Sequence, residues 1–308
     1  MDKPQFLAGY APDIASECER LLVTVIRGLG PWRESVYLIG GLTPRYLRDP
    51  KHPNPRPHAG TGDVEVVVDL QMLADIEAYA TLEANLKKLG FQRDENAKHQ
   101  KISWRWFRIG EKGHKLILEL LADDPKLAAA KVQELPTKGT VSALNVPHSS
   151  MVFDFHDKVV IAAELLDGGG MYEATIRYAD IVTFTCLKAL AYTDRWERKD
   201  AHDLIYCLEH WAGGVDGAAK LFMERAGSKH GPVLANSLDR LRAHFVTTTT
   251  TGAAVEGYTK DGPVAVAFFE LGEDVATTAR EARILRQREA SDVIERLLAA
   301  IEALKAGK

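Results

Sequence analysis

Apolar residues recur along the chain with two different spacings, and these spacings separate a part rich in strands from a part rich in helices. Residues 13–29 and 74–89 carry apolar side chains three and four positions apart, which predicts two amphipathic helices. Alternating or short continuous apolar runs predict strands at residues 36–39, 63–69, 101–108 and 115–121. A Gly-Glu-Lys-Gly turn separates the last two strands, so we expect them to form a hairpin.

The later residues follow helical spacing for most of their length. Asp180 to Trp211 predicts two packed helices, residues 217–241 predict one or two more, and residues 276–304 predict a long charged helix. Short strands are also expected at residues 151–155, 159–163 and 263–269, and connections at 133–150 and 247–251. The expected fold class is therefore α+β, with a mixed sheet and helices in a domain of residues 1–125 and a mainly helical C-terminal domain of residues 126–308.

Composition narrows the class of protein without naming a function. Of 308 residues, 46% are hydrophobic and 27% charged, which is ordinary for a globular protein. The net charge of -4 excludes a strongly basic chain, although a local basic groove for nucleic acid remains open. Apolar runs are too short for a membrane span, and the first residues have no apolar signal region. Widely spaced Cys18, Cys186 and Cys207 indicate free thiols, so we expect a cytoplasmic protein without a membrane partner.

The stretch from Leu38 to Asp69 carries the residues with the clearest chemistry. Asp63 and Glu65 alternate with valine on an expected strand, so both side chains project from one face. Two adjacent carboxylates repel each other, and a shared divalent cation relieves that repulsion. A glycine pair at residues 40–41, directly after a strand, lets a phosphate approach the backbone. This order predicts a site for a metal-bound nucleoside triphosphate. The alternative is an ordinary half-exposed strand with its acids in water.

Three further features have both a functional and a plain structural interpretation. Glu119, an acid within an apolar strand, needs either a metal ion or a buried salt-bridge partner. The proline-rich loop at residues 49–62, which contains Arg56, is either a basic flap for phosphates or a solvated connection. Aromatic and basic residues alternate on one expected strand at Trp104, Arg105, Trp106 and Arg108. These four could stack on and clamp RNA, or they could form a core face with basic edges.

The two helices expected near residues 180–211 carry charges in a fixed order. These charges are Lys188, Arg195, Lys199, Asp200 and Asp203. Because Asp200 and Asp203 are three residues apart, they share one face of a helix. Charges on a helix most often form a solvated face. In the functional interpretation, the two aspartates orient Lys188 or Arg195 through charge-assisted hydrogen bonds.

Taken together, these segments resemble the nucleotidyltransferase superfamily, and they are most similar to the AbiEii-type toxins of bacterial type IV toxin–antitoxin and phage-defence systems. The glycine pair and the acid strand of the superfamily correspond to residues 40–41 and 63–65, with Thr61 at the position of a hydroxyl residue. The lysine, arginine and basic-Asp-x-x-Asp series of the AbiEii-type proteins corresponds to the ordered charges at residues 188–203. The similarity covers residues 30–210. Glu65 stands where aspartate is commoner, and the gap from the glycine pair to Asp63 is long.

The resemblance implies Mg²⁺-dependent transfer of a nucleotidyl group from a nucleoside triphosphate (NTP). It implies a two-metal site at Asp63, Glu65 and Glu119. It assigns catalytic roles to Lys188 and Asp203 as well, and nucleotide-binding roles to Gly40, Gly41, Thr61, Arg56, Arg195, Lys199 and Asp200. Family relatives suggest tRNA, at its 3′ end, as the acceptor and a cognate antitoxin as a partner, and the helical domain is expected to complete the active-site cleft. The alternatives are transfer to a small molecule or protein, and a catalytically silent module that binds a partner through its long C-terminal helix.

Overall fold

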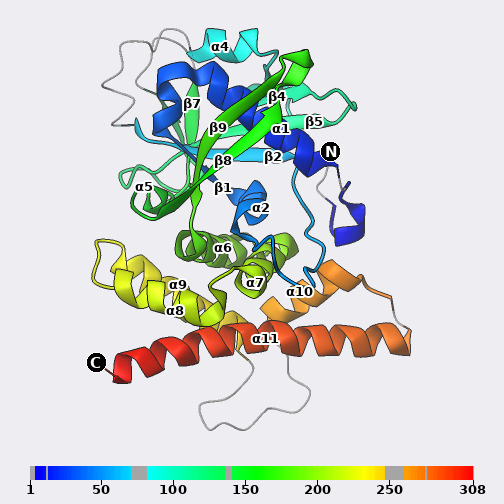
Figure 1. Ribbon diagram of the computed structural model, residues 1–308, viewed down its shortest axis with the longest axis vertical. Coiled ribbons are helices and arrows are strands. Elements are labelled where there is room, and N and C mark those ends of the chain that lie inside the picture. Colours follow the sequence, from blue (N-terminus) through cyan, green and yellow to red (C-terminus); the bar gives the residue numbers. More distant parts are fainter. Residues whose placement is uncertain are drawn as a thin grey trace. The chain divides into compact units, whose positions relative to one another are not determined.

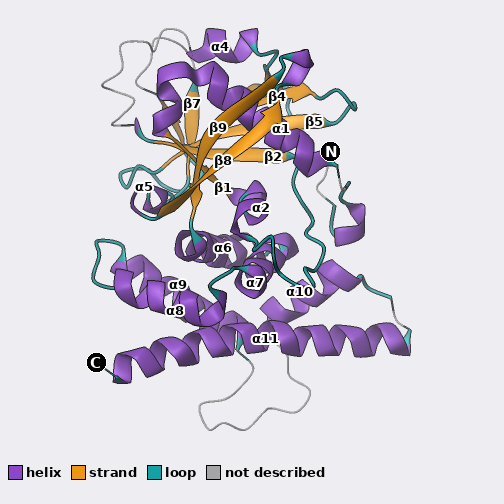
Figure 2. Ribbon diagram, viewed as in Figure 1, coloured by secondary structure: helices purple, strands orange, loops and turns teal. Residues whose placement is uncertain are grey.

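The computed structural model describes residues 4–11, 13–70, 82–135, 141–246, 260–274 and 276–307 (Figure 1). The chain forms two compact units, each built from separate stretches of sequence. The first, which we call the helical unit, comprises residues 1–11, 47–59 and 181–308. The second, which we call the sheet unit, comprises residues 12–46 and 60–180. Figure 2 shows strands in the sheet unit and long helices in the C-terminal region, which confirms the expected α+β class.

A mixed sheet forms the centre of the sheet unit, with the strand order β3-β4-β5-β2-β1-β9-β8 and with β7 pairing with both β5 and β6. Its strands are β1 (Val36–Ile39), β2 (Asp63–Val68), β3 (Gln92–Glu95), β4 (Lys101–Ile109), β5 (Lys115–Ala122), β6 (Val132–Glu134), β7 (Ser142–Asn145), β8 (His156–Glu164) and β9 (Met171–Ala179). The central strand β2 pairs antiparallel with β1 and parallel with β5. All four strands predicted for the first part of the chain are confirmed.

One helix, α1 (Ile14–Leu29), packs against β2, β5, β8 and β9, and it confirms the helix predicted at residues 13–29. A Cβ added to Gly62 would lie 3.1 Å from Cδ1 of Ile14, so α1 covers the side of β2 to which Gly62 and Val64 belong. Val64 and its neighbour Leu118 on β5 are fully buried on that side. The alternate residues of β2 have their side chains on the opposite side of the sheet. Of the helix predicted at residues 74–89, only α4 (Leu82–Lys88) falls within the described residues.

The second half of the sheet unit differs from expectation. Residues 151–155 form a short helix, α5 (Met151–Asp154), because an apolar run of four residues does not distinguish a strand from a helical turn. The strand β8 is longer than predicted, and β9 was not predicted. Strand β7 lies within the predicted connection at residues 133–150, and β6 overlaps its start. All four strands join the one sheet. The expected domain boundary at residue 125 therefore falls inside the sheet unit, and the C-terminal helices begin only at Ile181.

The helical unit is built from six long helices among the residues that are described. They are α6 (Ile181–Arg195), α7 (Arg198–His210), α8 (Gly214–Arg225), α9 (Gly231–Phe245), α10 (Asp261–Leu271) and α11 (Thr277–Ala306). The strand predicted at residues 263–269 is wrong, because α10 packs its apolar residues between α7 and α11. The other predicted helices are confirmed, and the connection at residues 247–251 lies outside the described residues. A short α2 (Pro44–Leu47) precedes the loop of residues 47–59. In the described part of the chain, no helix combines the length and apolarity needed to cross a membrane.

Candidate functional site

Three carboxylates lie at neighbouring positions on one face of the central sheet. Asp63 and Glu65 are two residues apart on β2, and Glu119 on β5 is the register partner of Glu65. Adjacent strands are about 4.8 Å apart, and residues two apart on a strand share a face. All three side chains therefore project from the same patch, on the side opposite Val64 and Leu118. The sheet brings together the three acids that the sequence predicted as metal ligands.

Asp63 is held in a buried position at the start of β2. Its exposed fraction is 6%, so the interpretation of an ordinary strand with its acids in water does not hold for this residue. The Asp63 N–H donates to Oγ1 of Thr61 at 3.2 Å, and the Thr61 carbonyl accepts from Sγ of Cys18 at 3.2 Å. Burial, together with the negative charge of Asp63, raises the pKa of the Cys18 thiol and keeps it neutral. Thr61 therefore helps to hold the backbone at Asp63 in position.

The glycine pair lies against Glu65. Strand β1 ends at Ile39, the register partner of Glu65, and Gly40 follows with a φ of +73°. A Cβ on Gly40 would lie 1.4 Å from Oε2 of Glu65, so only glycine fits there without displacing the carboxylate. The Gly41 N–H donates to the same oxygen at 3.1 Å. The turn does bind an anionic oxygen, as the phosphate prediction requires, but the oxygen in this structure belongs to Glu65.

Glu119 has the salt bridge that the structural interpretation required. Nε of Arg105 lies 3.3 Å from Oε1 of Glu119 and 3.2 Å from Oδ2 of Asp94. Nζ of Lys115 donates to Oδ1 of Asp94 at 2.6 Å. Although burial opposes ionisation of Asp94, the hydrogen bond from Lys115 lowers its pKa, so it remains an anion between two cations. Glu119 is therefore an acid held beside the cation of Arg105.

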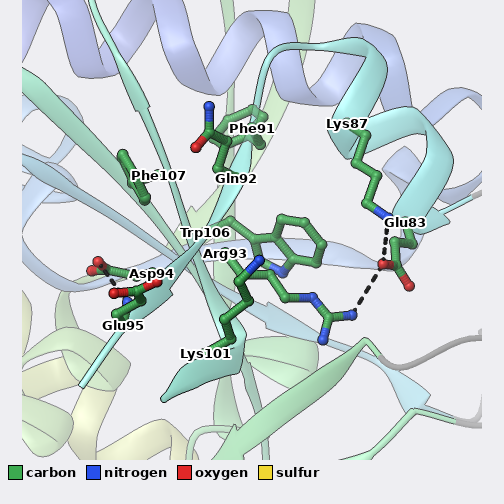
Figure 3. Close-up of a pocket in the computed structure, with 10 residues that line it drawn as sticks. All are labelled: Glu83, Lys87, Phe91, Gln92, Arg93, Asp94, Glu95, Lys101, Trp106 and Phe107. Carbon is green, nitrogen blue, oxygen red and sulfur yellow. Dashed lines mark hydrogen bonds and ion pairs between the residues drawn. The ribbon is translucent and has the colours of Figure 1, made fainter. Parts of the chain in front are cut away.

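A pocket of about 750 Å³ lies beside this network rather than over the acids. Its lining residues come from α4, β3 and β4, and they include Asp94 but not the three predicted ligands (Figure 3). Arg93 contacts Glu83 at 3.2 Å and lies with its guanidinium 5.1 Å from the ring centroid of Trp106. Glu83 thus pairs with two cations of the lining, Arg93 and Lys87, whereas Asp94 pairs with Lys115 and Arg105 outside the pocket. We assign the candidate chemistry to the acids, because a carboxylate cluster binds cations whereas this pocket offers balanced charges.

The strand with alternating aromatic and basic residues is β4. Two of its residues are buried, as the interpretation of a core face predicted. Trp106 is fully buried, and Arg108 is 8% exposed. The Arg108 guanidinium donates to the Leu89 carbonyl and to the Asp167 carboxylate, each at 2.7 Å. Both groups are committed to the sheet unit's own interior, so the structure does not support their use as an RNA clamp.

The ordered charges at residues 188–203 form a buried network in the helical unit. Nζ of Lys188 donates to Oδ1 of Asp200 at 2.8 Å and to Oδ2 of Asp203 at 2.7 Å. Asp200 also accepts two bonds from Arg195, at 2.6 and 2.9 Å, and Lys199 contacts Asp203 at 2.8 Å. Asp203 is fully buried and Asp200 is 2% exposed, so the solvated-face interpretation is wrong for these aspartates. The hydrogen bonds that these aspartates accept from Lys188 and Arg195 are the charge-assisted contacts of the functional interpretation.

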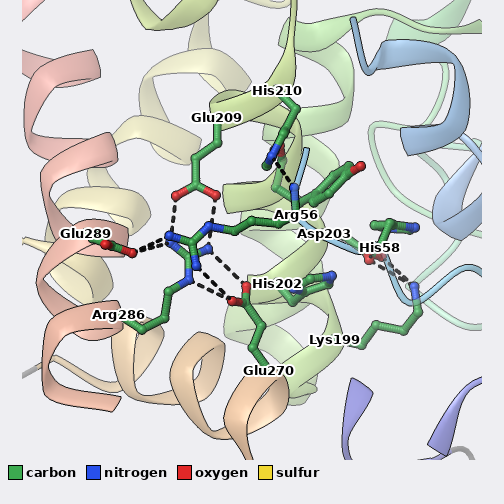
Figure 4. Close-up of polar contacts among 11 residues, drawn as sticks. Arg56, His58, Lys199, His202, Asp203, Glu209, His210, Glu270, Arg286 and Glu289 are labelled. Carbon is green, nitrogen blue, oxygen red and sulfur yellow. Dashed lines mark hydrogen bonds and ion pairs between the residues drawn. The ribbon is translucent and has the colours of Figure 1, made fainter. Parts of the chain in front are cut away.

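The loop of residues 47–59 is attached to this network (Figure 4). Nε2 of His58 lies 2.9 Å from Oδ1 of Asp203, and the Arg56 N–H donates to Nε2 of His210 at 3.0 Å. The Arg56 guanidinium contacts Glu289 at 2.5 Å. The loop is therefore neither a solvated connection nor a free basic flap. Because carboxylates of the helical unit already neutralise Arg56, we leave it out of the nucleotide-binding residues that we propose below.

Burial and charge fix the protonation of the pair at the centre of this network. Burial lowers the pKa of His58 to about 4, against the opposing effect of Asp203. Burial also opposes ionisation of Asp203, but Lys188 and Lys199 outweigh it and hold the Asp203 pKa well below its usual range. A neutral His58 thus donates its Nε2–H to an ionised Asp203. The loop position of His58 gave no sign of this contact, because its partner lies 145 residues away in the sequence.

Among the described residues, His58, His202 and Asp203 are the one group of three His, Cys, Asp or Glu side chains with ligand atoms within 4.8 Å of one another, a geometry that could hold a metal ion. Nδ1 of His202 contacts Glu270 at 2.9 Å, and Nε2 of His202 is buried without a hydrogen-bond partner among the described residues. The charge balance opposes a cation, however. Asp203 already accepts from two ammonium groups, both close enough to repel a metal ion. We therefore assign this group to the attachment of the loop.

The predicted site residues fall into two sets. The sheet unit holds Gly40, Gly41, Thr61, Asp63, Glu65 and Glu119, and the helical unit holds Arg56, Lys188, Arg195, Lys199, Asp200 and Asp203. Within each unit the predicted residues are brought together, apart from Arg56, which pairs with glutamates instead. Sequence reasoning missed Arg105 as the partner of Glu119 and Asp94 as a second partner of Arg105. In the helical unit it missed Glu270, which contacts both His202 and Arg286. Only register would have revealed Arg105, since it is the strand partner of Glu119.

Comparison with known proteins adds no family to this geometry. No protein-family model matches the chain, and no curated protein matches its sequence. The functional argument therefore depends on the motifs and on the arrangement of the carboxylates.

Acidification is expected to destabilise the helical unit before most carboxylates titrate. The pKa of His58 is depressed from 6.5 to about 4 in the folded chain, and burial also lowers the pKa of His210. As the pH falls below 6.5, the unfolded chain gains protons that the folded chain does not, so stability is lost from pH 6.5 towards pH 4. Urea denaturation at several pH values, followed by hydrogen exchange in α7, measures this slope. A His58→Gln variant should show a shallower slope, and an equal slope would contradict the assignment.

Proposed function

We propose that the protein is a Mg²⁺-dependent nucleotidyltransferase that transfers a nucleoside monophosphate from an NTP to an acceptor. One observation carries the proposal. Asp63, Glu65 and Glu119 occupy adjacent positions on one face of β2 and β5, directly beside a glycine turn that binds an anionic oxygen. Together with the resemblance to the nucleotidyltransferase superfamily, this favours an AbiEii-like enzyme over a silent binding module, since a binding module has no need of clustered acids.

The donor set suits magnesium. Mg²⁺ prefers hard oxygen ligands and binds through a few carboxylates together with substrate phosphates. Asp63, Glu65 and Glu119 supply such oxygens, and a cation would also relieve the repulsion among them. When bound, the metal ions would neutralise the triphosphate and help to activate the attacking hydroxyl.

The protein's own residues hold these ligands in place. Gly41 fixes one oxygen of Glu65, Thr61 fixes the backbone of Asp63, and Arg105 fixes Glu119. Since these contacts exist before any substrate binds, little reorganisation is needed when charge develops at the phosphate. Arg105 and its partner Asp94 are positioning residues in this scheme.

In the helical unit, Lys188 and Arg195 carry the positive charge that the resemblance assigns to the phosphates. Asp200 contacts both cations, and Asp203 contacts Lys188, so each cation is held in one orientation by a buried carboxylate. Asp200 and Asp203 already neutralise these cations, as glutamates neutralise Arg56, so we also leave Lys188 and Arg195 out of the nucleotide-binding residues. We propose that the two aspartates hold Lys188 and Arg195 in place within the helical unit. Lys199, which is bound to Asp203, supports the same network.

For the acceptor we propose RNA, specifically the 3′ end of tRNA, with toxicity through blocked translation and a cognate antitoxin as partner. The support for this step is the resemblance to the AbiEii-type toxins. The nucleotide is left to experiment.

A transfer assay tests the proposal. Purified protein receives Mg²⁺, total RNA and each α-labelled NTP in turn, beside Asp63→Asn and a control, Asp157→Asn, which changes an exposed acid of the same sheet. We expect label on RNA of tRNA size, reduced by about two orders of magnitude or more in Asp63→Asn and unchanged in the control. Binding of NTP without label on RNA would redirect the search to a small-molecule or protein acceptor. Absence of Mg²⁺-dependent NTP binding would overturn the enzyme assignment.

A further inference from the structure

Strand β8 is an end strand of the sheet, and it is long and largely exposed. It spans nine residues and pairs only with β9 among the described strands. Val160 at its centre is 58% exposed, and Met171, which faces Glu164 across the β8–β9 pair, is 69% exposed. An exposed edge strand with apolar side chains is a ready template for pairing with another strand.

The backbone groups that point away from β9 can be identified. The Leu165 N–H donates to the Gly170 carbonyl, so in this antiparallel pair the odd-numbered residues of β8 direct their N–H and C=O groups towards β9. The even-numbered residues direct theirs outward. In agreement, the outward carbonyl of Glu164 accepts from Nε of Arg20 at 3.0 Å. Lys158, Val160 and Ala162 thus present a row of outward-facing backbone groups.

The side chains of these same residues are arranged with opposite charges at the two ends. Lys158 lies opposite Arg177 of β9, which places two positive charges side by side at one end. At the other end, Glu164 lies two pairs along from Glu173, which is opposite Ala162. Like charges directly opposite each other, as at Lys158 and Arg177, are unfavourable, although Glu34 offsets the charge of Arg177. A second hairpin in the reverse direction would place a negative end beside each positive end.

We propose that two copies of the chain associate through β8, antiparallel about Ile161, to form one continuous sheet. In this register Lys158 faces Glu164 of the second copy, and Val160 faces Ala162 of the second copy. In each copy, residues 158, 160, 162 and 164 all direct backbone groups outward. The register that pairs these backbone groups is therefore the same register that pairs the opposite charges. The inference is independent of the proposed function, because β8 contributes none of the candidate site residues.

The interface is small, and the affinity should be modest. The ladder ends at Glu164, since its carbonyl already accepts from Arg20 and its carboxylate lies 3.5 Å from the same guanidinium. Short interfaces of this kind belong to the weak class, so we expect a dissociation constant on the order of micromolar. The contrasting interpretation is that Lys158 protects the edge from pairing, as lysines on edge strands often do. The two interpretations predict different oligomeric states.

Sedimentation equilibrium of the full chain, from about 1 to 100 µM, distinguishes them. We expect a reversible monomer–dimer equilibrium. Lys158→Glu and Glu164→Lys should each be monomeric, because each places like charges across the interface. An equimolar mixture of these two variants should dimerise, since every facing pair is then of opposite charge. Lys98→Glu, in the β3–β4 turn, is the control and should dimerise like the unchanged chain. A monomer throughout the range, or single variants that dimerise normally, would overturn the proposal.

A proline variant tests the backbone ladder separately from the charges. Val160 directs its N–H outward, so Val160→Pro removes a hydrogen bond of the proposed interface without removing one from the β8–β9 pair. We expect loss of the dimer with the cooperative thermal unfolding of the monomer retained. Dimerisation by a folded Val160→Pro variant would show that β8 is not the interface.

Discussion

Replacing Asp203 by alanine is expected to lower the free energy of unfolding of the helical unit by about 3–5 kcal/mol. Asp203 is fully buried and accepts hydrogen bonds from Lys188, Lys199 and His58. Its removal leaves two buried ammonium groups with one fewer carboxylate, and the loop of residues 47–59 loses the contact made by His58. The loss should therefore exceed that of a single ion pair, because breaking a buried network leaves uncompensated charge in the interior.

Urea denaturation followed by hydrogen exchange in α6 and α7 measures this effect, since the two compact units need not unfold together. The control is Asp194→Ala, which removes an aspartate of α6 that is 68% exposed and paired with Arg240. Exposed pairs of this kind contribute about 0–1 kcal/mol. If the two variants are equally stable, Asp203 is not the centre of the network.

Replacing Gly40 by alanine is expected to disable the candidate site and to destabilise the sheet unit by about 2–5 kcal/mol. The substitution combines a left-handed backbone, which costs about 1–2 kcal/mol for a residue with a Cβ, with overpacking, which costs about 1–3 kcal/mol. The overpacking arises because the new Cβ would lie 1.4 Å from Oε2 of Glu65. The Glu65 carboxylate must move, and its hydrogen bond from Gly41 is then lost.

Gly113→Ala separates the two contributions. Gly113 also has a positive φ, +82°, but a Cβ there meets no atom within 4 Å. Its expected cost is the backbone contribution alone, about 1–2 kcal/mol, with transfer activity unchanged. Thermal unfolding and the transfer assay provide the two measurements. Equal effects on activity from both variants would remove Glu65 from the proposed site.

The elements with long, regular patterns were predictable from the sequence. The apolar faces of α1, α7 and α11 repeat over several turns, and the alternation in β4 and β5 is bounded by a glycine turn. The acid pair on β2 was also recognisable, because spacing of two on a strand fixes a shared face. Glu119 was also predicted as a site residue, but its position was not: the parallel pairing of β2 and β5 places it beside Glu65, a relation that the sequence alone does not contain.

The sequence did not predict the burial of side chains whose partners lie far away along the chain. Asp200 and Asp203 look like part of a solvated helix face until Lys188, Lys199 and His58 are brought around them. Helix α10 resembles a strand because its small and large apolar residues alternate, and only packing against α7 and α11 decides the outcome. Strand β9 was missed for a different reason. Its alternation from Tyr172 to Tyr178 was visible, but no strand was predicted there.

The division of the helical unit among separate stretches of sequence has a consequence for biosynthesis. His58 leaves the ribosome 145 residues before Asp203, its partner, and strands β2 to β9 of the sheet unit are made in between. The helical unit therefore cannot complete its charged interior until nearly all of the chain has been synthesised. A fragment beginning at Ile181 would contain α6 to α11, the long helices of the helical unit, and yet lack His58 and Arg56. Such a fragment would expose Asp203 and Glu289 without these partners, so truncation at Ile181 would yield an incomplete unit rather than an independent domain.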